Sequence, residues 1–300
     1  MTDTLTHDLP HGTRLHCRVN GAPGRPVLLF LHGFPEGAFV WDALLDHFSK
    51  PEHGAYRCVA PSLRGYGESS APAEVSDYRP KHLICDVLAM IERESGSAPL
   101  AALVAHDWGG AVAWGLANQH PERLQKLAII NSPHPGTFWR ELRDNPAQQA
   151  ASAYMNFLVR PDAEALLAAD DHRRLWSFFA DDQGQAPDWL DAATRTLYRQ
   201  TWERGLRGGV NYYRASPLRP RTAGDPGASG LELPAALWRI DVPTLVLWGT
   251  RDRALLPCLL DGLETHIAHL QTERWTDASH WIVHEHPRRV AHRLETFLQS

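Results

Sequence analysis

Three residues that lie far apart in the sequence could together carry out nucleophilic catalysis: Asp107, Asp252 and His280. Asp107 stands between Ala105 and Gly109, in a variant of the Gly-x-Ser-x-Gly nucleophile elbow that has a carboxylate in place of the serine hydroxyl. The order nucleophile, acid, histidine along the chain is one of the orders in which a catalytic triad occurs. The alternative interpretation is that Asp107 is only the N-cap of the helix that follows it.

The acid of this triad has a rival in the sequence. Asp252 and His280 each come shortly after a predicted strand, and the carboxyl ends of parallel strands meet at one edge of a sheet. Asp277 is close to His280 as well, but it stands in the same loop, which favours Asp252 as the acid. Asn131 follows a third predicted strand, where some hydrolases carry their acid, but its amide cannot serve as one.

A second motif predicts an oxyanion hole beside the elbow. The apolar run 27–31 leads directly into His32-Gly33-Phe34-Pro35-Glu36. A strand that ends in such a loop places a backbone N–H, here that of Phe34, next to the nucleophile, and the elbow supplies a second N–H from Trp108. The alternative is an ordinary turn after a strand.

A carboxylate nucleophile restricts the substrate class. Attack by Asp107 on an ester carbonyl would give an anhydride, which is no easier to form than the substrate is to cleave. Attack on an sp³ carbon gives a stable alkyl ester, which suits epoxides and alkyl halides. Water activated by His280, with Asp252 orienting the ring, would then hydrolyse that ester. This chemistry needs no metal and no organic cofactor.

The elements that must position these residues alternate between strands and helices, which predicts an α/β fold with a doubly wound, mostly parallel sheet. Predicted strands lie at 13–20, 27–31, 56–60, 124–130, 244–249 and 270–275, with a further one beginning at Leu100. Predicted helices of this part lie at 41–48, 78–93, 111–118 and 287–298.

One long segment interrupts the alternation and predicts a division into domains. From Pro133 to about Pro217 the sequence is helical and aromatic without convincing strands, as expected of a helical lid. We therefore expect a first core segment at 1–132, a lid at 133–218 and a second core segment at 219–300.

Composition narrows the classes of binding partner and the cellular location. The 300 residues carry a formal net charge of −5 and no basic block, so nucleic acid is not an expected partner. No apolar stretch approaches the length of a membrane span, and the N-terminal residues lack the apolar run of a signal peptide. The four scattered cysteines suit reduced thiols, so we expect a cytoplasmic protein. Whether it is a monomer or a homodimer is left open.

Nearly the whole chain resembles the α/β-hydrolases of the epoxide hydrolase branch, to which haloalkane dehalogenases are closely related. The motifs that carry the resemblance are those at 32–36, 106–110 and 131–135. The resemblance implies an α/β-hydrolase fold with an inserted helical lid. It also implies that Tyr154 and Tyr213 are the two tyrosines that open the epoxide ring, although their spacing alone favours packing in the lid.

The expected function is therefore the opening of an apolar epoxide to a vicinal diol through an ester on Asp107. A haloalkane dehalogenase with the same nucleophile is the alternative, and a non-catalytic ligand receptor is a third hypothesis. Phe34 weakens the halide hypothesis because many dehalogenases carry Asn at that position. The candidate residues of the substrate pocket are His32, Pro35, His106, Trp139, Phe157 and Trp281.

Overall fold

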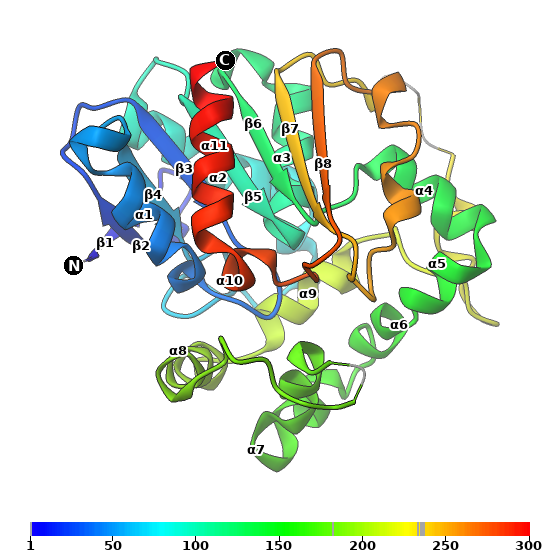
Figure 1. Ribbon diagram of the computed structural model, residues 1–300. Helices are drawn as coiled ribbons and strands as arrows, with labels where there is room; N and C mark the ends of the chain where they lie inside the picture. Colours follow the sequence, from blue (N-terminus) through cyan, green and yellow to red (C-terminus); the bar gives the residue numbers. More distant parts are fainter. Residues whose placement is uncertain (1, 182, 233, 235–237) are drawn as a thin grey trace.

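Figure 1 shows a computed structural model that describes residues 2–181, 183–232, 234 and 238–300; residues 1, 182, 233 and 235–237 of the expected segments lie outside it. A single sheet runs through the centre in the order β1-β2-β4-β3-β5-β6-β7-β8. Its strands are β1 (Asp3–Asp8), β2 (Arg14–Asn20), β3 (Val27–Leu31), β4 (Arg57–Pro61), β5 (Ala102–His106), β6 (Leu127–Ile130), β7 (Thr244–Gly249) and β8 (Leu270–Trp275). In the order β4-β3-β5-β6-β7-β8 every neighbouring pair is parallel. β1 is antiparallel to β2, and β2 is antiparallel to β4.

Helices cover both faces of the sheet, which is why its central strands β3, β4, β5, β6 and β7 are buried at every position and are mostly apolar. Around the sheet lie α1 (Asp42–Phe48), α2 (Pro80–Ser95), α3 (Asp107–Gln119), α10 (Ile282–Glu285) and α11 (Pro287–Gln299). In β3, Leu28 and Phe30 belong to the core that contains the apolar residues of α1 and α11, whereas Leu29 and Leu31 belong to the core of α2 and α3. Near-continuous apolar strands are typical of a parallel sheet buried on both faces, and the predicted α/β-hydrolase fold class is confirmed.

The structure differs most from the sequence prediction in three elements, and the other predicted elements agree with it to within two residues at each end. β1 was not expected, because this edge strand is mostly exposed, pairs only with β2 and has no apolar alternation. The strand predicted at 124–130 begins only at Leu127. The helix predicted from residue 111 begins at Asp107, because the elbow leads into α3 without an intervening loop.

Between β6 and β7 the chain forms a layer of helices beyond the carboxyl ends of the strands (Figure 1). They are α4 (Pro135–Asp144), α5 (Pro146–Ala151), α6 (Tyr154–Leu158), α7 (Ala163–Phe179), which is interrupted at 169–172, α8 (Ala192–Glu203) and α9 (Arg207–Ala215). This arrangement supports the division into core segments at 1–132 and 219–300 and a lid at 133–218, which we keep as a proposal.

Two expectations from composition can be compared with the fold. All four cysteines are free: Cys17 and Cys58 are buried, Cys258 is partly buried and Cys85 is exposed. Within the described ranges, none of the helices combines the length and the apolar character needed to cross a membrane.

Candidate active site

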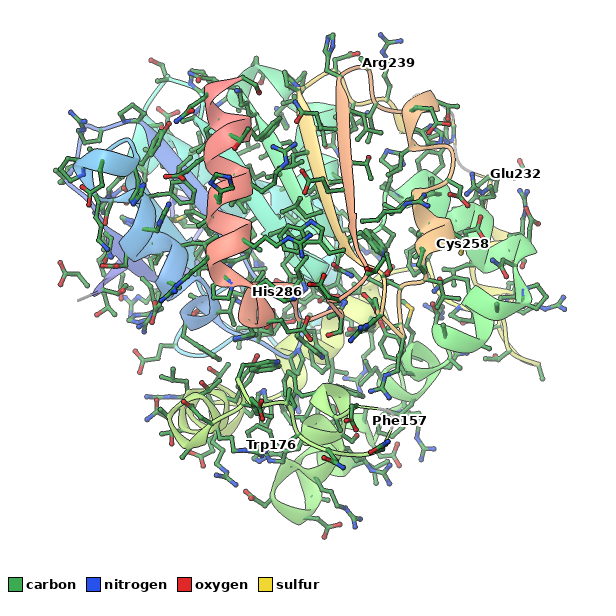
Figure 2. The ribbon with its side chains drawn as sticks, viewed as in Figure 1. Phe157, Trp176, Glu232, Arg239, Cys258 and His286 are labelled. Atoms are coloured by element: carbon green, nitrogen blue, oxygen red, sulfur yellow. The ribbon has the colours of Figure 1, made fainter. Side chains whose placement is uncertain are left out.

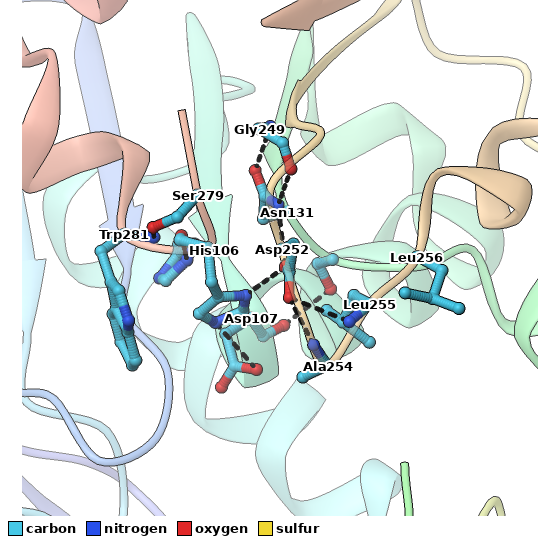
Figure 3. A network of polar contacts seen from close by, with 12 residues as sticks. His106, Asp107, Asn131, Gly249, Asp252, Ala254, Leu255, Leu256, Ser279 and Trp281 are labelled. Carbon is cyan, nitrogen blue, oxygen red and sulfur yellow. Dashed lines mark hydrogen bonds and ion pairs between the residues drawn. The ribbon is translucent and has the colours of Figure 1, made fainter. Parts of the chain in front are cut away.

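The three residues expected to form a triad lie together at the carboxyl edge of the sheet. Figure 3 shows Asp107 and Asp252 on the two sides of this group. Asp107 follows β5, Asp252 follows β7 and His280 follows β8. Because β5 to β8 are successive parallel neighbours, their carboxyl ends meet at one edge. His280 Nδ1 lies 2.6 Å from Asp252 Oδ2, and His280 Nε2 lies 3.7 Å from Asp107 Oδ2. The histidine thus bridges the two carboxylates.

Asp107 sits on a turn that only small neighbours permit. Its φ of 49° is in the left-handed region, which is rare for a residue other than glycine. A Cβ at Gly109 would lie 2.4 Å from the Leu31 carbonyl oxygen, and a Cβ at Gly33 would lie 2.2 Å from Asp107 Oδ1. The two glycines therefore let the backbone of the elbow approach β3 and the loop after it.

Backbone donors hold the Asp107 carboxylate. The Phe34 N–H donates to Oδ1 at 2.7 Å, and the Trp108 N–H donates to the same carboxylate. Burial raises the pKa of Asp107, although His280 and these two donors oppose the rise. The two N–H groups expected to form an oxyanion hole therefore both face the carboxylate of Asp107.

Asp252 is the carboxylate that contacts His280, and Asp277 is not. Asp252 is 3% exposed, and its Oδ1 accepts hydrogen bonds from the backbone N–H groups of Ala254 and Leu255 at 2.9 Å each. Burial by itself would raise the pKa of Asp252, but His280 and these donors lower it below its ordinary value. Asp277 is exposed and pairs with Arg289 instead.

The charges around His280 set its protonation state. Burial alone would lower the pKa of this imidazole, but the ion pair with Asp252 and the charge of Asp107 raise it to about 9. His280 is therefore an imidazolium at neutral pH as long as Asp107 is ionised.

Asn131 holds the acid in place, a contribution that the sequence analysis missed. Its Nδ2 donates to Asp252 Oδ2 at 2.9 Å and to the Gly249 carbonyl at 3.2 Å, and its Oδ1 accepts from the Gly249 N–H at 2.8 Å. The residue has a φ of 37°, a conformation that Asn tolerates better than most residues. An Asn directly after a buried strand was the available indication.

A second missed feature is a buried polar network around Glu36. This carboxylate is 1% exposed and accepts hydrogen bonds from His106 Nδ1 at 2.8 Å, from the Tyr198 hydroxyl at 3.1 Å and from His284 Nε2 at 3.1 Å. Burial would raise the pKa of Glu36, but His106 and His284 hold it well below its usual range. Its negative charge also helps to raise the pKa of His280.

Both tyrosines singled out in the sequence line the same cavity as Asp107. Tyr154 is the first residue of α6 and Tyr213 lies in α9, and their ring centroids are 6.0 Å apart. Burial, with a further contribution from the charge of Asp107, raises the pKa of both hydroxyls above the ordinary tyrosine value, so both are protonated at neutral pH. Tyr212 is different, because its hydroxyl donates to the Arg64 carbonyl oxygen at 3.0 Å.

The cavity has a volume of about 620 Å³, and its wall combines an aromatic part, formed by Phe34, Phe178, Phe179 and Trp281, with polar and charged residues. Of the six residues expected to form the substrate pocket, Trp281 lines it. The expectation is corrected for the other five, which lie outside its lining: His32, Pro35, His106, Trp139 and Phe157.

Two of these five hold loops together instead. The fully buried His32 contacts the Gly33 carbonyl oxygen through Nδ1 at 2.9 Å and accepts from the Leu63 N–H through Nε2 at 3.0 Å. The Pro35 carbonyl accepts from the indole N–H of Trp202 at 2.7 Å, which fastens α8 to the loop after β3.

The other three make contacts behind or beside the cavity lining, and His106 lies directly behind it, with Nε2 3.0 Å from the His280 carbonyl oxygen. His106 is 1% exposed and is occupied by the Glu36 network described above. The indole N–H of Trp139 donates to the Ala228 carbonyl oxygen at 3.1 Å. Phe157 lies in the helical layer beyond the sheet (Figure 2), and the guanidinium carbon of Arg174 is 5.6 Å from the centroid of the Phe157 ring.

Among the residues that the structure describes, one group of three metal-ligating side chains stands close together: His47, His53 and Glu295. It shares no residue with the cavity lining.

Comparison with known proteins gives consistent matches over nearly the whole chain. The profile of the alpha/beta hydrolase fold family matches residues 26–287. Epoxide hydrolase 1 of Caenorhabditis elegans is 31% identical over 294 residues, which cover 96% of this chain and 68% of that protein. The crystal structure of a Bacillus megaterium epoxide hydrolase with an inhibitor is 31% identical and matches with a TM-score of 0.88, covering 99% of this chain and 100% of that one. A structure described with novel epoxide hydrolases from hot-environment metagenomes is 35% identical, with a TM-score of 0.84 and 99% of each chain covered.

Proposed function

Because this chain belongs to the α/β-hydrolase family and is an epoxide hydrolase, we propose that Asp107 is the nucleophile that opens the epoxide and that His280, oriented by Asp252, hydrolyses the resulting ester. One observation carries the assignment. The Asp107 carboxylate, held by the Phe34 N–H, shares a cavity with His280 and with the hydroxyls of two protonated tyrosines.

In the first step, a carboxylate oxygen of Asp107 attacks an epoxide carbon and the carbon–oxygen bond of the ring breaks. Oδ1 is held by the Phe34 N–H, so Oδ2 is the oxygen that we assign to the new ester bond. The departing ring oxygen would leave as an alkoxide and needs a proton. Tyr154 and Tyr213 supply hydroxyl donors on the cavity wall, and either or both can donate to this oxygen as its negative charge develops.

In the second step, His280 takes a proton from water, and the resulting hydroxide attacks the carbonyl carbon of the Asp107 ester. Negative charge then develops on Oδ1, where the N–H groups of Phe34 and Trp108 stabilise it. The bond between Oδ2 and the carbonyl carbon then breaks, the diol leaves with Oδ2 and takes the proton back from His280, and Asp107 is restored as a carboxylate that carries one oxygen of the water. Ester formation prepares His280 for this role. It removes the negative charge of Asp107, one of the contributions that raise the histidine pKa, so the ring gives up its proton more readily than in the free enzyme.

This mechanism predicts a pH dependence for the ester hydrolysis step. The rate should rise with pH and level off as His280 becomes neutral, with an apparent pKa below the value of about 9 that holds while Asp107 is ionised. The apparent pKa of ester hydrolysis is obtained from the single-turnover decay of the ester, followed by tryptophan fluorescence at a series of pH values. The pKa of His280 in the free enzyme is obtained from a histidine NMR titration. An apparent pKa for hydrolysis equal to or above that of the free enzyme would contradict the mechanism.

A single turnover in water labelled with the heavy oxygen isotope tests the proposed function directly. With enzyme in excess over an epoxide, the oxygen added to the first diol should come from Asp107, and the label should appear in the peptide that contains Asp107. Label in the diol with unlabelled Asp107 would mean direct attack by water and would refute the nucleophile assignment. Release of halide from a haloalkane at a rate above that of epoxide opening would favour the dehalogenase instead, and reversible binding without turnover would favour a receptor.

The cavity walls also guide the substrate proposal. Phe34, Phe178, Phe179 and Trp281 present aromatic surface to the bound molecule, which supports an apolar substituent on the epoxide. The four free cysteines support a reducing compartment, and we propose the cytoplasm as the location of the protein.

A further inference from the structure

A compact group of side chains lies on the sheet face covered by α1 and α11, outside the active site. His47 is in the last turn of α1, His53 ends the short 3₁₀ turn Pro51–His53, and Glu295 lies in α11. Three separate elements thus bring two imidazoles and one carboxylate to one point. All three side chains are partly buried, with exposed fractions of 25%, 30% and 22%.

The contacts within the group converge on one oxygen atom. Glu295 Oε1 lies 3.0 Å from His47 Nε2 and 2.5 Å from His53 Nδ1, and one ligand atom from each residue lies within 4.8 Å of the others. The two imidazoles are stacked, with centroids 3.7 Å apart and planes 17° from parallel. Among the residues that the structure describes, Glu295 forms no ion pair with a lysine or arginine, and its contacts are with the ring nitrogens of His47 and His53.

We propose that His47, His53 and Glu295 form a binding site for one divalent transition-metal ion of the Zn²⁺ type. Zn²⁺ takes imidazole nitrogen and carboxylate oxygen at about 2.0–2.2 Å, and three protein ligands with a water in the fourth position are a common set. In a tetrahedral site with such bonds, neighbouring ligand atoms are about 3.4 Å apart. The separations of 3.0 Å and 2.5 Å are shorter than this, so Glu295 must move outward by a few tenths of an ångström to about 1 Å before the ion fits between the three ligand atoms.

The rings must also turn for both nitrogens to point at one ion. With their planes nearly parallel, the lone pairs of His47 and His53 do not yet converge. About a quarter or more of each side chain is exposed, so each ring can rotate about its bond to Cβ toward solvent without displacing the core. The ion would then replace the polar contacts that now join the two imidazoles to Glu295.

An ion at this place would link the C-terminal helix to the first helix of the core. α11 packs on α1, and the turn that ends at His53 adjoins both through Glu295. A ligand that binds only the folded state stabilises it by mass action. We therefore expect the melting temperature to rise with the concentration of Zn²⁺, and we expect epoxide turnover to be unaffected because the group shares no residue with the cavity.

The test is a calorimetric titration of the untagged full-length protein with Zn²⁺, compared with three variants. Wild type should bind one Zn²⁺ per chain saturably. His53→Ala and Glu295→Gln should each weaken that binding by more than the roughly 10- to 100-fold that loss of an outer-shell partner costs. His292→Ala is the matched control, because His292 is an exposed histidine on the same helix and should leave the affinity unchanged. Melting temperatures without Zn²⁺ and the rate of epoxide turnover establish that each variant is folded.

Two results would overturn the proposal. One is the absence of saturable Zn²⁺ binding to wild type, and the other is an unchanged affinity in both folded variants. Co²⁺ gives an independent readout, because its visible absorption reports the ligand set. The spectrum of the wild-type Co²⁺ complex should be lost in His53→Ala and kept in His292→Ala, and the opposite pattern would place the ion elsewhere.

Discussion

A His280→Gln variant mixed with an epoxide that the wild type hydrolyses should accumulate a covalent ester on Asp107. The substitution removes the base of the second step but leaves the nucleophile and the Phe34 donor in place. Steady-state turnover should fall by roughly 10⁴-fold, the scale seen when a triad histidine cannot act as base. Intact-protein mass spectrometry should show the whole mass of the epoxide added, because the opened oxygen stays on the adduct, whereas a haloalkane would add its mass less that of hydrogen halide.

Two controls make this experiment specific. Peptide mapping should place the adduct on the peptide that contains Asp107, and Asp107→Asn should form no adduct unless the amide reverts to the acid, which the protein mass would reveal. His292→Gln, at an exposed histidine of α11, should turn over the epoxide like the wild type. If a folded His280→Gln protein forms no adduct at Asp107 on any accessible timescale, the two-step mechanism is wrong for this protein.

Substitution of the two tyrosines should slow the first step and spare the second. Loss of one preorganised donor to a developing oxyanion costs roughly 10²- to 10³-fold in rate. We expect Tyr154→Phe and Tyr213→Phe each to slow ester formation by up to that factor, since the remaining hydroxyl can still donate, and the double variant to be slower than either. Rapid-mixing measurements of the alkylation rate would quantify the effect, because steady-state rates report the slower hydrolysis as well.

The neighbouring tyrosine provides the matched control for this series. Tyr212 is in the same helix α9, but its hydroxyl donates to the Arg64 carbonyl oxygen and does not line the cavity. Tyr212→Phe should therefore leave the alkylation rate unchanged and cost only about 1 kcal/mol of stability for the lost hydrogen bond. Alkylation rates that match the wild type in both single variants and in the double variant would show that Tyr154 and Tyr213 only pack the lid.

Features that depend on a short stretch of chain could be predicted from the sequence. The central strands are mostly apolar because both of their faces are buried, so a continuous apolar run such as 27–31 can be recognised as a strand from the sequence. The elbow around Asp107 requires small residues within two positions, because Gly109 lies against the backbone of β3. The order of strands and helices then placed Asp107, Asp252 and His280 at the ends of their strands, and parallel pairing brings such ends to one edge.

The edge strand β1 shows where local pattern fails. Asp3–Asp8 is held by its pairing with β2, and most of its side chains face solvent, so no hydrophobic periodicity marks it. The prediction of the substrate-pocket residues was mostly wrong for a related reason. His32 and Trp139 have side chains suited to contact a substrate, yet their polar atoms are occupied by backbone groups of other segments. Whether a side chain points into the cavity or toward another segment was decided by packing against residues far away in the sequence.

The contacts that complete the site were decided by the tertiary structure alone. Asn131 reaches Asp252 only because β6 and β7 are adjacent, and the buried charge of Glu36 acts on His280 through a loop that folds beside it. The convergence of His47 on Glu295 likewise depends on how α11 packs against α1. The sequence by itself determined the fold class and indicated that Asp107, Asp252 and His280 stand at the ends of their strands, since these follow from residue type and periodicity within single elements. Tertiary structure decided which polar groups meet, because a hydrogen bond or ion pair depends on distances of a few ångströms between elements whose relative positions no local pattern specifies.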